Sequence, residues 1–310
     1  MPTLNMSADE LREKARTIRH DVLVSIHTAM SGHPGGPLSA ADYLTALWMN
    51  HLNLDPANPF WPERDRFVLS NGHCSALLYA LMSHRGLFAR GYLLTFRTLN
   101  SRLQGHPSKT SLPGVEVSSG SLGQGLSVAH GMALGLRMRG TPEQTVFCNC
   151  GDGELQEGNI WEAIMHAGHR RTDNLIVSVD WNNAQIDGYV ENVKSITPLP
   201  DKFKAFGWRA IVAEGHDMDD IVRAWNEATA GTPARGNGCG QPTAILFKTV
   251  MMKGCPTYEN IPGWHGRPPK EDEIMLMLKE LGYDYQTVNE ARAAMGGVQE
   301  YDGYGADDGN

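Results

Sequence analysis

The 310-residue sequence lacks any apolar run approaching the roughly 18 residues of a membrane-spanning helix, so it predicts no membrane partner. Its start, MPTLNMSADE, lacks the basic segment and apolar stretch of a secretion signal. It also lacks a block of Lys or Arg, and its net charge of -8 argues against binding to nucleic-acid phosphates. We therefore expect a cytoplasmic protein that acts on small molecules or on other proteins.

Cysteine is scarce, and the five cysteines form an odd set without a CxxC pair. A cytosolic chain of this size gains little from disulfides, so we expect free thiols. Cys148 and Cys150 alternate within an apolar run and therefore point to one face of a predicted strand. Burial there is a better interpretation than zinc ligation.

Helix-like and strand-like segments alternate along the chain. Ser7 and Glu10 form a capping box before apolar residues at helical spacing, which predicts a helix over residues 8–30. Apolar runs without polar alternation, typical of parallel strands covered on both faces, occur at 66–70, 144–150, 174–180, 208–213 and 243–250. Further helices are predicted at 39–51, 74–86, 126–139, 155–170 and 218–230.

This alternation predicts an α/β fold, a three-layer doubly wound and mainly parallel sheet with helices on both faces. We expect one domain over residues 1–295. The Gly- and Asp-rich segment 296–310 has little to bury and is expected to be a flexible acidic tail.

The most informative motif is GDGELQEG at residues 151–158, between a predicted strand and a predicted helix. Asn182 lies thirty positions after Asp152, at the end of the next strand, so both side chains face one crevice. Gly153 lets a diphosphate approach the free N–H groups at the helix start. The oxygens of Asp152 and Asn182, with a backbone carbonyl near Ala184, suit Mg²⁺ or, as an alternative, Ca²⁺. An isolated GDG would indicate only a turn, and the following Asn favours a ligand site.

Gly-Asp-Gly followed by this Asn, with Gly188 closing the loop WNNAQIDG, resembles the thiamine-diphosphate motif. Five further segments resemble transketolase segments and occur in transketolase order: SGHPGGPLSAAD, DRFVLSNGHCSALLYA, QGHPS, SSGSLGQGLSVAHGMALG and GWHG. The chain is thereby identified as a member of the transketolase family. The resemblance implies thiamine diphosphate and Mg²⁺ as cofactors and the transfer of a two-carbon ketol unit from a ketose phosphate to an aldose phosphate.

Four histidines lie inside these segments, and any one of them alone would favour a solvated or structural role. The resemblance implies that His73 and His265 reach the diphosphate. It also implies that His33, His106 and His265 line the substrate channel and move protons for the sugar hydroxyls. A neutral imidazole near pH 7 suits that task, so all four are candidate catalytic residues.

The resemblance also places Gly120 and Leu122 beside the cofactor, and Gly153 and Glu157 with them. Glu157 and Glu162 on the helix after the GDG motif would otherwise be read as solvated acids. In transketolases the corresponding acids hydrogen-bond across the dimer, so we expect this pair at an interface between subunits.

The sequence shows no unit that would hold the aminopyrimidine of the cofactor near a carboxylic acid. Full-length transketolases carry that unit in a following pyrimidine-binding domain and C-terminal domain. We therefore expect this chain to be the diphosphate-binding subunit of a split transketolase, with two copies joining two copies of a C-terminal subunit. Departures from the family pattern remove no proposed ligand: Ser121 where proline is usual, and Glu154 and Trp181 inside motif segments.

Three alternatives are open. The chain could belong to a related ketol or acyl transferase, such as a deoxyxylulose-phosphate synthase-like enzyme or a transketolase for one sugar or sulfo-sugar. It could be a non-catalytic cofactor-binding subunit that regulates another enzyme. An NAD-dependent dehydrogenase is disfavoured, because the Gly-rich segment GSLGQG does not follow an apolar strand.

Overall fold

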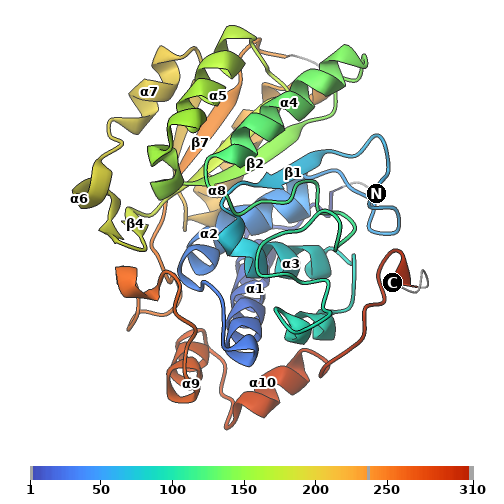
Figure 1. The fold of residues 1–310 in the computed structure, drawn as a ribbon, viewed down its shortest axis with the longest axis vertical. Helices are drawn as coiled ribbons and strands as arrows, with labels where there is room; N and C mark the ends of the chain where they lie inside the picture. The colour runs from blue at the N-terminus through green and yellow to red at the C-terminus, as the bar shows by residue number, and fades with distance from the viewer. Residues whose placement is uncertain (1–2, 236–237, 307–310) are drawn as a thin grey trace.

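The computed structural model describes residues 3–235 and 238–306. Its centre is a five-stranded parallel sheet with the strand order β1-β2-β3-β7-β6 (Figure 1). The strands are β1 (Arg66–Leu69), β2 (Val146–Gly151), β3 (Leu175–Trp181), β6 (Arg209–Glu214) and β7 (Thr243–Lys248). All five predicted strands are confirmed, and a small antiparallel hairpin adds β4 (Ala184–Gln185) and β5 (Gly188–Tyr189).

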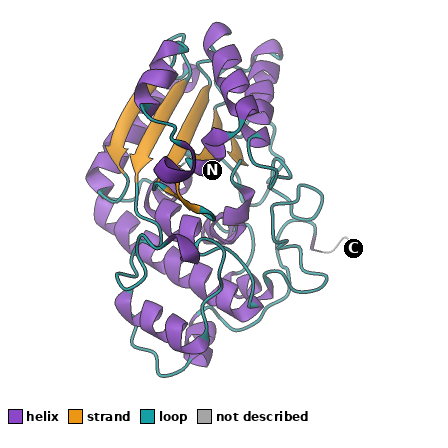
Figure 2. Cartoon of the chain, turned by 60° about the vertical axis from the view of Figure 1, so that its left-hand side comes forward, coloured by secondary structure: helices purple, strands orange, loops and turns teal. Residues whose placement is uncertain are grey.

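Side chains of the central strands alternate between two buried layers. Val146, Cys148 and Cys150 of β2 pack with α4, α5 and α7, whereas Phe147 packs with α1, α2, α3 and α8. Figure 1 shows α4, α5 and α7 on one side of the sheet and α1 to α3 on the other, and Figure 2 shows helices flanking the strands. The predicted three-layer α/β fold is confirmed. Burial of the parallel strands on both faces accounts for their near-continuous apolar runs.

The long helices are α1 (Ala8–Ala29), α2 (Gly35–Ala46), α3 (Ser75–His84), α4 (Gln124–Met138), α5 (Gly158–His169), α8 (Met218–Ala230) and α9 (Glu271–Glu280). The shorter ones are α6 (Val190–Lys194), α7 (Leu199–Ala205) and α10 (Val288–Ala294). A short π-helical segment, η1 (Leu47–His51), follows α2. Short 3₁₀ helices occur at η2 (Gly72–Cys74), η3 (Arg90–Thr95), η4 (Gly153–Gln156), η5 (Pro233–Arg235) and η6 (Pro262–Trp264). Among the described residues, no helix combines the length and the apolar character needed to cross a membrane.

Local sequence signals account for several helix boundaries. Ser7 accepts a hydrogen bond from the backbone of Glu10, and the Glu10 side chain bonds back to Ser7, so the predicted capping box starts α1. The second helix begins at Gly35 rather than at the predicted Ser39, because Pro34 stands at its N-cap and the glycines adopt helical backbone angles. The thiols of Cys148 and Cys150 lie 3.9 Å apart on one face of β2, and both are free, as predicted.

The end of the described chain lies against the body of the protein. Asp302 accepts a hydrogen bond of 2.7 Å from the backbone of Ala89, and Gln299 accepts one of 3.0 Å from Gly91. The Tyr301 ring lies 5.3 Å from the ring of Tyr92. The aromatic ring and polar side chains of this segment thus have partners around η3, and the flexibility of residues 296–310 stays a prediction. Residues 307–310 of that tail lie outside the described residues.

Candidate functional site

A cavity of about 340 Å³ lies at the carboxyl ends of β2 and β3. Five segments meet there: the loop after β1, the loop before α4, the GDG loop after β2, the loop from β3 to the hairpin and the turn after η6 that carries His265. The predicted site residues that line this cavity are His73, Leu122, Asp152, Gly153, Glu157, Asn182, Ala184 and His265. The fold thus brings together residues that are more than a hundred positions apart in the sequence.

Asp152 follows β2 directly and is held by the backbone on both sides. Its two carboxylate oxygens accept hydrogen bonds from the N–H groups of Gly153, at 2.7 Å, and Asn183, at 2.5 Å. Burial raises the pKa of Asp152 to about 8, and the nearby carboxylate of Asp180 adds to this effect. A carboxylate in this environment favours a cation beside it.

Asn182 follows β3 and is oriented by its neighbours. Its side-chain nitrogen donates to Asp180 at 3.0 Å, and its side-chain oxygen accepts from the backbone of Ala184 at 2.9 Å. Asp180 is itself buried and accepts from the hydroxyls of Ser39, at 2.6 Å, and Thr249, at 2.5 Å. Sequence analysis did not single out Asp180 or Ser39, although an acid that ends a buried apolar strand is a usable signal.

The donor chemistry of this corner suits a small hard cation. Asp152 offers a carboxylate, Asn182 an amide oxygen and Ala184 a backbone carbonyl, and all of these are oxygen ligands. Among the described residues, no group of three or more His, Cys, Asp or Glu side chains is arranged to hold a metal ion. Asp152, Asn182 and Ala184 would supply three of the six ligands that Mg²⁺ prefers, which leaves positions for water or for the oxygens of a bound anion.

The four predicted histidines form one cluster although they come from four separate segments. The ring centre of His33 lies 5.3 Å from that of His73, 5.7 Å from that of His265 and 6.3 Å from that of His106. His73 and His265 line the cavity, and their ring centres are 4.9 Å apart. His33 and His106 do not line this cavity but extend the cluster away from it.

Burial keeps these imidazoles neutral. It lowers the pKa of His33 to about 4, lowers that of His73 well below its usual range, and lowers those of His106 and His265. For His33, His73 and His106, neighbouring positive charge lowers the pKa further. The buried Nδ1 atom of His33 has no hydrogen-bond partner within the described part of the chain. The cluster can therefore accept protons or hydrogen bonds from a ligand.

Two glycines allow the histidines to come close to the loops. Gly120 has φ +143°, and a β-carbon there would lie 2.9 Å from the His106 ring. A β-carbon on Gly266 would lie 3.0 Å from the His33 ring. Gly120 does not line the cavity, and its effect on the site passes through His106.

The three acids that follow the GDG turn differ in burial. Glu154 is buried, whereas Glu157 at the cavity and Glu162 on α5 are exposed. Burial raises the pKa of Glu154 to about 7, against three hydrogen bonds that lower it. Sequence analysis recorded Glu154 only as a departure from the family pattern, because burial is not readable from its position in the motif.

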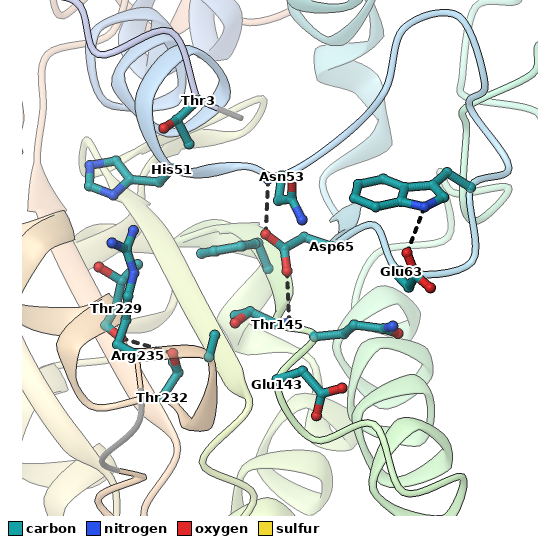
Figure 3. Close-up of a pocket in the computed structure, with 14 residues that line it drawn as sticks. Thr3, His51, Asn53, Glu63, Asp65, Glu143, Thr145, Thr229, Thr232 and Arg235 are labelled. Atoms are coloured by element: carbon teal, nitrogen blue, oxygen red, sulfur yellow. Dashed lines mark hydrogen bonds between the residues drawn. The ribbon is translucent and has the colours of Figure 1, made fainter. Parts of the chain in front are cut away.

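A second and larger cavity, of about 500 Å³, lies near the amino ends of β1 and β2, away from this site. Figure 3 shows His51 and Arg235 on one side of it, Glu63 and Glu143 on the other, and Asp65 between them. Asp65 accepts hydrogen bonds from the backbones of Asn53, at 2.9 Å, and Thr145, at 2.8 Å. Its carboxylate thus holds the segment before β1 against the start of β2, which is a structural role.

His51 in this second cavity should make the protein sensitive to acid. Burial lowers its pKa to about 4, helped by Arg235, whereas an unfolded histidine titrates near 6.5. Between pH 6.5 and 4, His51 is protonated in the unfolded chain and neutral in the folded one. Proton binding therefore stabilises the unfolded chain as the pH falls, and the free energy of unfolding decreases. We expect His51→Gln to reduce this slope by up to about 1.4 kcal/mol per pH unit, measured by denaturant unfolding at several pH values. His169→Gln, an exposed change on α5, should leave the slope unchanged, and equal slopes for all three proteins would contradict the assignment.

Comparison with known proteins identifies relatives of the whole chain. The family model "Transketolase, thiamine diphosphate binding domain" matches residues 11–302. The chain is 39% identical over 272 residues to the 6-deoxy-6-sulfo-D-fructose transketolase subunit SqwG of Clostridium sp. strain MSTE9, covering 88% of this chain and 96% of that protein. It is 35% identical to an apulose-4-phosphate transketolase subunit of Actinobacillus succinogenes, covering 91% of this chain and 99% of that protein.

Among solved structures, transketolase from Campylobacter jejuni superposes with a TM-score of 0.83 at 34% identity, covering 94% of this chain and 46% of that one. The chain thus spans less than half of that transketolase and nearly all of the two subunits named before it. The family match, the two relatives and the shared fold agree with each other and with the motif order. The chain belongs to the transketolase family and comprises its thiamine-diphosphate-binding domain.

Proposed function

We propose that this chain is the thiamine-diphosphate-binding subunit of a split transketolase that moves a two-carbon ketol unit from a ketose phosphate to an aldose phosphate. The observation that carries the proposal is one cavity that combines the corner of Asp152 and Asn182 with His73 and His265, two members of a cluster of four neutral histidines. The first suits a cation and a diphosphate, and the second suits proton transfer to sugar hydroxyls. The two relatives of nearly equal length, both named as transketolase subunits, support this assignment.

In this proposal Asp152, Asn182 and the carbonyl of Ala184 hold Mg²⁺, with Ca²⁺ as a possible substitute. Gly153, with no side chain, leaves room for the diphosphate, and His73 and His265 donate hydrogen bonds to it. Leu122 and Glu157 flank the cofactor from the cavity wall, and Gly120 supports it through His106. Thiamine diphosphate, when bound, supplies the nucleophilic carbon that attacks the ketose carbonyl.

The histidines act on the sugar. His33, His106 and His265 accept hydrogen bonds from the donor hydroxyls, and one of them takes the proton whose loss accompanies cleavage of the C2–C3 bond. Burial suits them to this task, because it keeps the imidazoles uncharged at neutral pH. The retained cluster also argues against the alternative of a non-catalytic regulatory subunit, which would have no use for four placed imidazoles.

The cavity is open on a side where apolar side chains face solvent. Among its lining residues, Ile186 is 67% exposed, Val193 45% and Leu122 39%. A C-terminal subunit with the pyrimidine-binding and C-terminal domains would cover these side chains and complete the cofactor site. We propose two copies of each subunit, with the exposed Glu157 and Glu162 at the interface, and a cytoplasmic location.

A second candidate is a transketolase dedicated to one unusual sugar. It is favoured by the names of the two relatives, which specify a sulfo-sugar and apulose 4-phosphate. The residues in the cavity are common to both candidates, because they serve the cofactor and the reacting hydroxyls rather than the far end of the sugar.

Reconstitution tests the proposal. The chain is mixed with the product of an adjacent reading frame that carries a thiamine pyrimidine domain, together with Mg²⁺ and thiamine diphosphate. Ketol transfer from xylulose 5-phosphate is then measured, with each chain alone as a control. We expect the mixture to be active and either chain alone to be nearly inactive. Full activity of this chain alone would refute the split enzyme, and activity confined to sulfofructose or apulose phosphates would favour the second candidate.

A further inference from the structure

Glu154 is a buried acid whose carboxylate binds two distant loops and the end of β2. Its side chain is 2% exposed, and it lies in η4 directly after the GDG turn. It accepts hydrogen bonds from the hydroxyl of Ser70, from the backbone of Gly123 at 2.8 Å and from the backbone of Gly151 at 3.2 Å. Three donors therefore converge on one carboxylate.

Each of these donors belongs to a loop that faces the cavity. Ser70 begins the loop that carries His73, and Gly123 ends the loop that carries Leu122. Gly151 immediately precedes Asp152. The donors lie 84, 31 and 3 positions from Glu154 in the sequence, so the carboxylate links its own segment to two distant loops. The backbone of Ser70 also bonds to Asn149 of β2 at 2.9 Å, and the carboxylate adds a side-chain contact to that link.

The packing around this carboxylate leaves little room for the loops to shift. A β-carbon on Gly125 would lie 2.5 Å from the Ser70 hydroxyl. Gly123 has φ +88°, and a β-carbon there would lie 2.5 Å from Asn159. The start of α4 therefore touches the loop after β1 at Gly125 and touches α5 at Gly123, and Glu154 hydrogen-bonds to the first two of these segments.

An ionised carboxylate is the side chain that fits this arrangement, because all three partners donate and it only accepts. A glutamine would turn an NH₂ group toward at least one of these donors. That donor would then lose its partner while buried, which is unfavourable. The arrangement resembles an outer shell that orients the groups that touch a ligand.

We propose that Glu154 is a positioning residue that holds His73, Leu122 and Asp152 in the relative places that cofactor binding requires. This inference rests on the proposed function, since it concerns the same cavity. Glu154 itself lines the cavity wall, and both of its carboxylate oxygens are engaged by the three donors. The inference predicts that loss of the carboxylate weakens binding of thiamine diphosphate with Mg²⁺, because the loops that carry the cofactor-binding residues lose their shared partner.

The test is a calorimetric titration of the reconstituted complex with thiamine diphosphate in saturating MgCl₂. We expect Glu154→Gln and Glu154→Ala to weaken binding roughly 10- to 100-fold, the range found for outer-shell residues of metal sites. The apparent KM for thiamine diphosphate should rise by the same factor, while kcat at saturating cofactor changes less. Ser70→Ala, which removes one donor, should have a smaller effect and should add nothing in the Glu154→Ala background.

A matched control separates positioning from general destabilisation. Glu116 is also buried and pairs with Arg64 at 2.7 Å, outside the cavity. Glu116→Gln should lower the melting temperature without changing cofactor affinity. If Glu154→Ala fails to fold, the affinity of Ser70→Ala for thiamine diphosphate tests the inference in its place. Wild-type affinity in Ser70→Ala and in any folded Glu154 variant would overturn the inference, whereas failure of the wild-type complex to bind the cofactor would overturn the proposed function.

Discussion

Replacing Asp152 by alanine is expected to weaken Mg²⁺-dependent binding of thiamine diphosphate at least ~100-fold, the upper end of what loss of an outer-shell residue costs. The carboxylate is the charged member of the proposed Asp152, Asn182 and Ala184 ligand set. Without it the cation would lose the only anionic protein ligand in that set. The cation in turn is what balances the negative charge of the diphosphate, so a weakly held cation weakens cofactor binding. Calorimetric titration of the reconstituted complex, with and without Mg²⁺, measures the effect.

The unliganded chain should tolerate this replacement. Asp152 accepts two backbone hydrogen bonds, and losing such bonds costs about 1 kcal/mol each. Against this, the change removes a buried carboxylate that lies near Asp180 and is disfavoured by burial. The two effects oppose each other, so we expect only a small shift in the melting temperature of the unliganded chain.

Asp187→Ala is a matched control for the Asp152 prediction. Asp187 also lines the cavity, but it lies on the exposed hairpin loop. Removing an exposed charge there should change cofactor affinity only slightly, because solvent screens it. An equal loss in both variants would indicate a general electrostatic effect. Unchanged affinity in Asp152→Ala would remove the metal assignment.

Replacing His33 by alanine should reduce kcat for ketol transfer by about 10²- to 10⁴-fold, the usual contribution of a general acid or base. His33 is at the centre of the histidine cluster, and its buried Nδ1 has no partner within residues 3–235 and 238–306. Affinity for thiamine diphosphate should change little, because His33 does not line the cofactor cavity. Steady-state kinetics of the reconstituted complex and a cofactor titration measure the two quantities.

His130 provides a close control for the His33 prediction. It is also buried, and burial likewise lowers its pKa to about 4, but its Nε2 bonds to the hydroxyl of Thr172 at 3.1 Å, outside the cavity. His130→Ala should therefore affect stability more than kcat. A loss of kcat in His33→Ala no larger than that in His130→Ala would contradict a role for His33 in proton transfer.

Much of the fold is predictable because its determinants are local. The strands read as mostly apolar runs, since each central strand is buried on both faces, and the capping box of Ser7 and Glu10 marks the start of α1. The polar, Gly-rich composition around Tyr301 predicts a mobile tail and does not reveal the contacts that this segment makes with the body of the protein. Those contacts involve Tyr92 and Gly91, about two hundred positions earlier in the chain.

The site divides in the same way. The motif that contains Asp152 and the Asn182 at the end of the next strand are visible in the sequence, because parallel strands bring their carboxyl ends to one edge. The family resemblance implies that the four histidines serve one site, and the structure shows how far apart their rings lie. The roles of Asp180 and Glu154 required the tertiary structure, because each acts through hydrogen bonds to loops far away in the sequence. Periodicity and motif spacing predict structure that depends on residues close in the sequence. The hydrogen-bond partners of a buried carboxylate depend instead on how distant loops pack in the folded protein.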